Sequence, residues 1–152
     1  MERQDTGGKR GSPGDEGGGA PGPGRRVDAV ATALLDAAVE VHRTLGPGFG
    51  ESVYEEALDV ELTLRGVSFT RQVPVTIGYK DHVVGDARLD MLVADLVVVE
   101  LKAVEHIAPV HLAQALSYLR ATGRTLALVI NFNVPLLLRG VRRVIEPRRL
   151  TP

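Results

Sequence analysis

Three parts of the chain carry apolar residues at three- and four-residue steps, the spacing that predicts amphipathic helices. These parts are residues 27–45, 50–65 and 108–122. The first ends at Gly46-Pro47-Gly48, and a glycine also follows the last residue of each of the other two, where a helix stop is expected. The folded part of the chain is therefore expected to begin with two helices and to form a third one later.

Between the second and the third helix the pattern changes to extended, β-branched stretches, which predict strands. Residues 96–99 are apolar on both faces of such a strand, so the strand at 96–102 is expected in the interior of a sheet. The order of two helices, four strands, a helix and two strands is typical of an α/β fold, with a central mixed sheet of about four or five strands flanked by helices. The predicted strands are 69–79, 82–84, 88–93, 96–102, 125–131 and 141–145.

Composition separates a leader from a single domain. The chain has 152 residues, and its first 24 contain nine glycines and three prolines. Such a stretch buries too little apolar surface to offset its ordering entropy, so residues 1–26 are expected to be a disordered leader and 27–152 the folded domain. Without the first 24 residues the chain keeps 15 basic and 15 acidic residues, so nucleic-acid contacts must come from a local basic patch or a bound cation.

Two absences in the sequence exclude further classes of protein. There is no cysteine, which excludes disulfides, thiolate nucleophiles and cysteine-rich zinc sites. No apolar run approaches the roughly 20 residues that span a bilayer, and the glycine-rich start lacks the apolar stretch of a signal peptide. A soluble cytoplasmic protein without a membrane partner is therefore expected.

Asp90, Glu100 and Lys102 are the first candidates for chemistry. Residues i and i+2 of a strand share a face, so Glu100 and Lys102 project together, and a neighbouring Asp90 would complete a carboxylate pair that suits a hard cation such as Mg²⁺. The indices of Asp90 and Glu100 add to 190, so they oppose each other across a hairpin only if its loop has an odd number of residues, such as 94–96, or if one strand carries a bulge. Considered alone, the three residues fit an exposed strand end with an ordinary Glu–Lys pair better.

Polar residues of the second and third helices could extend this site. Glu51 and Glu55 lie on one face of the second helix, and either could point at the acidic face of the sheet, although the helix dipole alone also favours a carboxylate in a first turn. On the third helix His111, Gln114 and Tyr118 share one stripe. Buried or surface polar groups without a ligand role produce the same pattern.

Positive charge concentrates near the end of the chain, which makes this part the best candidate for phosphate contacts in a neutral domain. A solvated chain end explains the same charges equally well. The residues are Arg139, Arg142, Arg143, Arg148 and Arg149, with only Glu146 among them.

Six short motifs follow one another along the chain. They are Leu45-Gly46-Pro47-Gly48-Phe49-Gly50-Glu51-Ser52-Val53-Tyr54-Glu55, Arg71-Gln72-Val73-Pro74-Val75, Arg88-Leu89-Asp90, Val99-Glu100-Leu101-Lys102-Ala103, Gln114-Ala115-Leu116-Ser117-Tyr118-Leu119 and Ile130-Asn131-Phe132-Asn133-Val134-Pro135. As a set they resemble the GxxExxY family, a largely uncharacterised group placed in the PD-(D/E)XK nuclease superfamily. The resemblance covers about residues 27–145 and implies a restriction-endonuclease-like core.

The resemblance also implies which residues form the site. Asp90, Glu100 and Lys102 match the D…ExK core of the superfamily. Glu51 matches the helix-borne acidic residue of resolvase-like members, and Gln114 with Tyr118 matches the QxxxY motif of exonuclease-like members.

The implied function is a nuclease, dependent on Mg²⁺ or Mn²⁺, that hydrolyses phosphodiester bonds of DNA. Two alternatives stay open: a non-catalytic nucleic-acid-binding or accessory protein that retains the fold, and a partner-binding module whose acidic face is only structural. DNA or RNA as substrate, endo or exo action and a homodimer are open as well. The implied metal ligands are Asp90, Glu100 and Glu51, Lys102 assists the nucleophile, Gln114 positions Lys102 or the phosphate, and the expected substrate contacts are Tyr118, His111, Arg142 and Arg143.

Overall fold

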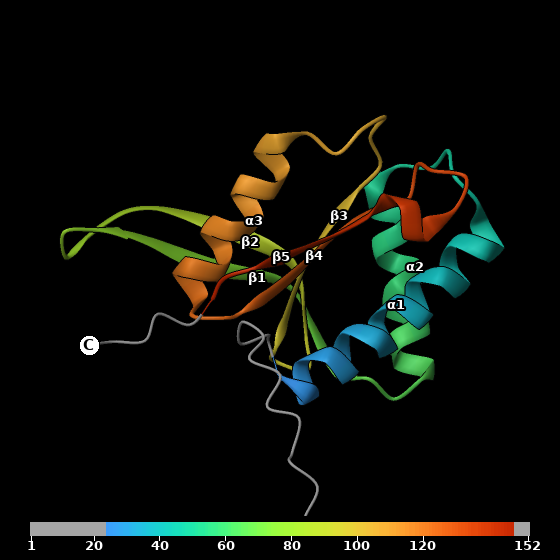
Figure 1. Cartoon of the computed structure of the whole chain (residues 1–152), viewed down its shortest axis with the longest axis horizontal. Coiled ribbons are helices and arrows are strands. Elements are labelled where there is room, and N and C mark those ends of the chain that lie inside the picture. The colour runs from blue at the N-terminus through green and yellow to red at the C-terminus, as the bar shows by residue number, and fades with distance from the viewer. Residues whose placement is uncertain (1–23, 148–152) are drawn as a thin grey trace, which may run out of the picture.

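A five-stranded sheet separates the helices of the protein into two layers (Figure 1). The computed structural model describes residues 24–147. The strands lie in the order β1-β2-β3-β4-β5, and all neighbours are antiparallel except β3 and β4, which are parallel. The elements in chain order are α1 (Arg25–Leu45), α2 (Glu51–Leu64), β1 (Phe69–Tyr79), β2 (His82–Val93), β3 (Val97–Lys102), α3 (Pro109–Thr122), β4 (Leu126–Asn131), the 3₁₀ helix η1 (Leu137–Gly140) and β5 (Val141–Ile145).

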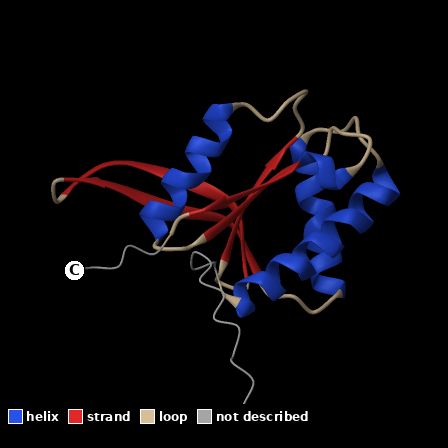
Figure 2. Cartoon of the chain, viewed as in Figure 1, coloured by secondary structure: helices blue, strands red, loops and turns tan. Residues whose placement is uncertain are grey.

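Each face of the sheet carries its own hydrophobic core. Helices α1 and α2 cover one face, here the α1–α2 face, and α3 covers the other, the α3 face (Figure 2). Along β3, Val97 and Val99 pack into the first core and Val98 into the second, because successive strand residues point to opposite faces. All three are fully buried, which confirms the prediction that this strand lies in the interior of the sheet.

Strand β2 is longer than the sequence predicts. The separate strands expected at 82–84 and 88–93 are one continuous strand, because Gly85, Asp86 and Ala87 remain paired with Ile77, Thr76 and Val75 of β1. Residues 82–86 are exposed on both faces of the strand. Their sequence therefore lacks the alternation of apolar and polar positions that predicts a half-buried strand. The tip of this β1–β2 hairpin extends beyond α3 in Figure 1.

The chain ends are described only in part. Most of the predicted leader, residues 1–23, and also Arg148 and Arg149 lie outside the described residues. Helix α1 begins at Arg25, two residues before the start expected from the apolar pattern. Among residues 24–147, no helix has the length and apolar character needed to span a membrane.

Candidate active site

The β2–β3 hairpin sets the register of the two central acidic residues. Its loop is the three-residue segment 94–96, and the ladder pairs Val93 with Val97 and Met91 with Val99. Continuing this register places Asp90 opposite Glu100, as an odd-numbered loop predicts from the sequence. The prediction of an odd-numbered loop is therefore confirmed.

Beyond the Met91–Val99 pair, hydrogen bonds to the acidic side chains replace the backbone–backbone hydrogen bonds between β2 and β3. The Leu101 N–H donates a hydrogen bond to Asp90 Oδ2 at 2.7 Å, and the Asp90 N–H donates a longer one to Glu100 Oε1 at 3.4 Å. Each acidic side chain thus bonds to the backbone of the opposite strand. The two carboxylates are held together where β2 and β3 separate.

Burial dominates the electrostatics of this pair. Glu100 is 5% exposed, and burial, reinforced by the negative charge of Asp90, raises the pKa of Glu100 to about 8. Burial also raises the pKa of Asp90, against the effect of the Leu101 N–H, which favours the charged form. The positive charge of Lys102 lowers the pKa of both carboxyl groups. Lys102 therefore acts on both members of the pair, as its position two residues after Glu100 predicts.

Asp90 also faces helix α2 across a small cavity. The cavity has a volume of about 210 Å³ and includes Glu51 and Ser52 from the first turn of α2. The negative charges of Glu55 and Glu51 both act to raise the pKa of Asp90. The full lining, here called the acidic cavity, is Glu51, Ser52, Glu55, Gln72, Asp90 and Leu101.

The two glutamates of α2 have different surroundings. Glu55 forms an ion pair with Arg71 at 2.7 Å and accepts a hydrogen bond from Gln72 Nε2 at 2.8 Å. Glu51 is exposed and forms no ion pair within residues 24–147. Of the two alternatives, Glu51 is the carboxylate whose charge is not already matched by a basic partner.

Arg71 and Gln72 are residues of the site region to which the sequence assigned no role. Besides Glu55, Arg71 bonds Glu56 at 2.7 Å and Asp59 at 3.0 Å, and these carboxylates raise its pKa above the ordinary value for arginine. The arginine thus fastens β1 to α2 beside the acidic cavity. The signal was available, because both residues belong to the motif Arg71-Gln72-Val73-Pro74-Val75.

Helix α3 places two of its three predicted site residues on the Glu100 side. Tyr118 is buried, and its pKa is raised by burial and by the charge of Glu100, while a hydrogen bond with the Gln114 side chain acts in the opposite direction. His111 serves its own helix, since its Nδ1 accepts the N–H of Ala108 at 3.0 Å. The structure thus brings Gln114 and Tyr118 together and leaves His111 at the start of α3.

The two arginines predicted to contact substrate lie on opposite faces of β5. Paired residues of neighbouring strands share a face, and the register aligns Glu100 with Val129 and Val129 with Arg142. Arg142 is therefore on the face of Glu100, two strands or about 10 Å away. Arg143 lies on the α1–α2 face, where it forms an ion pair with Asp28 of α1 at 3.0 Å.

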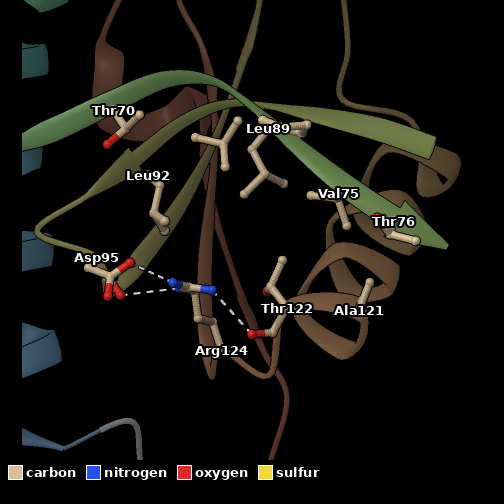
Figure 3. Close-up of a pocket in the computed structure, with 11 residues that line it drawn as sticks. Thr70, Val75, Thr76, Leu89, Leu92, Asp95, Ala121, Thr122 and Arg124 are labelled. Atoms are coloured by element: carbon tan, nitrogen blue, oxygen red, sulfur yellow. Dashed lines mark hydrogen bonds and ion pairs between the residues drawn. The ribbon is translucent and has the colours of Figure 1, made fainter. Parts of the chain in front are cut away.

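A larger cavity, of about 430 Å³, lies between β1, β2 and the end of α3 (Figure 3). Leu89 and Leu92 contribute apolar surface to it. Its charged residues are Arg124 and Asp95, which form an ion pair at 2.6 Å, and Arg124 also donates to the backbone oxygen of Thr122. Because these charges neutralise each other, the lining offers no free acid or base, and the candidate chemistry lies at the acidic cavity instead.

The donor set can be tested against the divalent cation that the sequence implies. Residues 24–147 contain no cluster of three or more histidine, cysteine or acidic side chains arranged to hold a metal ion. Mg²⁺ keeps several waters and is usually bound by only one or two carboxylates together with substrate phosphates. The pair of buried Glu100 and half-buried Asp90 fits such a cation, and Glu51 lines the same cavity as Asp90.

Comparison with known proteins identifies one family. The sequence model of the family described as PD-(D/E)XK nuclease superfamily matches residues 28–144, from the first turn of α1 into β5. The five-stranded mixed sheet flanked by three helices agrees with the restriction-endonuclease-like core of that superfamily. Neither the curated proteins nor the solved structures contain a match.

Proposed function

The chain belongs to the PD-(D/E)XK nuclease superfamily, and on that premise we propose that it is a metal-dependent nuclease of the GxxExxY group that hydrolyses phosphodiester bonds of DNA. The observation that supports this proposal best is the Asp90–Glu100 pair. Glu100 is buried and Asp90 is half-buried, each side chain accepts a hydrogen bond from the backbone of the other's strand, and the charge of Lys102 acts on both.

Asp90 and Glu100 would hold the cation, and Glu51 would supply a further oxygen from the first turn of α2. When bound, Mg²⁺ or Mn²⁺ supplies Lewis-acid activation of water and of the phosphodiester. Until a cation is present, the raised pKa of Glu100 keeps a proton on the carboxyl pair near neutral pH. A divalent cation would replace this proton and offset the repulsion between the two carboxylates.

Lys102 would stabilise the negative charge that develops on the phosphate. A preorganised ammonium next to the reacting group lowers the barrier because it needs no reorganisation at the moment of reaction. Gln114 would position Lys102 or the phosphate, and Tyr118, whose pKa is raised by burial and by the charge of Glu100, would contact the substrate together with Arg142. His111 and Arg143 were also predicted to contact substrate, and both would first have to give up the protein contacts described above.

The second candidate function is a non-catalytic nucleic-acid-binding or accessory protein that retains the nuclease fold. The observation that favours it is that backbone N–H groups already hold the Asp90 and Glu100 side chains, so the pair has a structural role that needs no cation. In this case the acidic pair would persist without cleavage. Metal binding alone does not separate the two candidates, whereas cleavage does.

The test is to incubate the purified protein with linear, nicked and four-way-junction DNA and with RNA, in Mg²⁺, in Mn²⁺ or in EDTA. We expect cleavage of DNA that EDTA and Asp90→Ala abolish. Asp86→Ala is a matched control, because Asp86 lies on the same strand and is exposed. Nucleic-acid binding without cleavage under every metal would favour the accessory role.

A further inference from the structure

Gln72 has an unusual backbone conformation for a residue within a strand. Its φ is 50°, and the other non-glycine residues of 24–147 with positive φ lie in the two hairpin loops, at Lys80, Asp81, Ala94 and Asp95. Left-handed backbone is rare for residues with a side chain and persists only where the surroundings enforce it. A strained residue that lines the acidic cavity points to a function for its conformation.

The side chains of β1 change faces at Gln72. Before it, Phe69 packs with the core of the α1–α2 face and Arg71 reaches the carboxylates of α2. After it, Val73 and Val75 pack with the core of the α3 face. In a regular strand all four odd-numbered residues would share one face, so the left-handed residue reverses the alternation.

The same reversal occurs in β2, at Asp90. Met91 and Val93 belong to the core of the α1–α2 face, whereas Leu89 and Ala87 pack on the α3 face. The register is unchanged across this point, since Arg71 pairs with Met91 and Val73 with Leu89. Gln72 and Asp90 therefore lie opposite each other. They fall between these two pairs but are not themselves paired in the ladder.

This reversal determines toward which face of the sheet the Asp90 side chain is directed. With regular alternation Asp90 would share the α3 face with Leu92, away from α2. Instead it lines the acidic cavity with Glu51, and its carboxylate reaches the N–H of Leu101. Contacts on both faces of the sheet hold Gln72 in its left-handed conformation. On one face Arg71 forms three ion pairs with α2, and on the other Val73 packs against the core of the α3 face.

We propose that Gln72 is a positioning residue, whose left-handed backbone conformation directs the Asp90 carboxylate toward helix α2 and onto the Leu101 N–H. Its importance for catalysis rests on the proposed nuclease function, whereas its effect on Asp90 does not. The Gln72 side chain has a separate contact, the hydrogen bond to Glu55. The proposal therefore concerns the backbone, and variants that differ in their tolerance of positive φ test it.

The first measurement is hydrogen exchange of the Leu101 amide, which reports the bond to Asp90 directly. Valine is β-branched and disfavours positive φ, so Gln72→Val is expected to speed this exchange by about tenfold or more. Glycine adopts positive φ without strain, so Gln72→Gly is expected to restore the slow exchange. Thr76→Val is the matched control, because it places valine at another exposed position of β1.

The second measurement is the rate of DNA cleavage, which should fall in Gln72→Val and recover in Gln72→Gly. Slow Leu101 exchange in Gln72→Val would overturn the proposal, as would exchange in Gln72→Gly as fast as in the valine variant. If the wild-type protein cuts no nucleic acid, the proposed function fails, but the exchange rates still decide the role of Gln72. If Gln72→Val is unfolded, a second pair of variants, Gln72→Ala and Gln72→Asn, tests the same point. Alanine tolerates positive φ less well than asparagine, so Gln72→Ala takes the place of the valine variant and Gln72→Asn that of the glycine variant.

Discussion

Asp90 Oδ2 accepts the backbone N–H of Leu101 at 2.7 Å, so the first acid of the site is bonded to the residue between Glu100 and Lys102. This contact couples the position of the aspartate to the strand that carries the other two predicted catalytic groups. It also gives the carboxylate a partner that favours its charged form, against the effect of burial. The geometry of the site therefore depends on where β2 and β3 separate as well as on which residues they carry.

The first prediction concerns pH and Glu100. Its pKa is raised from an ordinary 4.5 to about 8 in the folded protein, so the unfolded chain loses this proton first as pH rises. The stabilisation is complete below about pH 4.5 and is lost progressively up to about pH 8. In EDTA, Glu100→Gln should therefore raise the free energy of unfolding at pH 8 by on the order of 2–4 kcal/mol, and by little at pH 4.5. Urea denaturation across this pH range measures it.

Glu105→Gln is the control for this prediction, because Glu105 is almost fully exposed and should leave the pH dependence unchanged. A Glu100→Gln variant with the same loss of stability toward pH 8 as the wild type would contradict the raised pKa. Part of the loss should remain in any case, since Asp90 also has a raised pKa.

The second prediction distinguishes Glu51 from Glu55. Mg²⁺ that binds only the folded state raises the melting temperature by mass action. Glu51→Gln should weaken Mg²⁺ affinity, on the order of tenfold, because it replaces the charged carboxylate of a proposed ligand by a neutral amide. Glu55→Gln should instead destabilise the protein by about 1 kcal/mol through its bonds to Arg71 and Gln72, with a smaller effect on affinity. Melting curves at several Mg²⁺ concentrations measure both effects. If Mg²⁺ leaves the melting temperature of the wild type unchanged while Glu51→Gln raises it, Glu51 is an unfavourable surface charge.

The third prediction concerns Lys102. Lys102→Ala should leave Mg²⁺ binding nearly intact and slow cleavage by on the order of 10²-fold or more, because loss of one preorganised charge typically costs about 3 kcal/mol in the transition state. Lys102→Arg should not fully restore the rate, since a planar guanidinium cannot replace a compact ammonium in a small site. Single-turnover cleavage measures the effect, with Lys80→Ala at the exposed hairpin tip as control. Cleavage by Lys102→Ala at the wild-type rate would show that the D…ExK assignment is wrong.

The fourth prediction separates the two arginines of β5. Arg142 lies on the face of Glu100, whereas Arg143 is paired with Asp28 on the other face. If the DNA strand follows the face of Glu100, Arg142→Ala should reduce the slope of log affinity against log salt by about one. Arg143→Ala should leave the slope unchanged. A double variant with the wild-type slope would show that the strand runs elsewhere.

The fifth prediction concerns the support of the β4 end next to Lys102. A Cβ at Gly140 would overlap the backbone oxygen of Asn131, a residue that pairs with Lys102 across the sheet. Gly140→Ala should therefore destabilise the protein by about 2–3 kcal/mol, because backbone rather than a flexible side chain must move. Gly85→Ala is the control, since no atom lies within 4 Å of its Cβ position. Equal denaturation midpoints for the two variants would contradict this close approach.

Several features of the protein follow from the sequence by itself. The three helices, the interior position of β3 and the odd-numbered loop between β2 and β3 were all predicted correctly, to within two residues at the helix ends. These features depend on local periodicity, glycine stops and the two-residue repeat of a strand, which a single segment carries in its own residues. The same repeat could have shown that Arg142 and Arg143 point to opposite faces.

Other features were decided only by the tertiary structure. Which glutamate of α2 has its charge matched depends on Arg71, a residue of β1 that reaches α2 only in the folded protein. The continuity of β2 through residues 85–87 depends on pairing with β1. The left-handed conformation of Gln72 depends on ion pairs to α2 on one side and core packing on the other. Each is set by partners distant in the chain, and local sequence patterns contain no information about which residues those partners are.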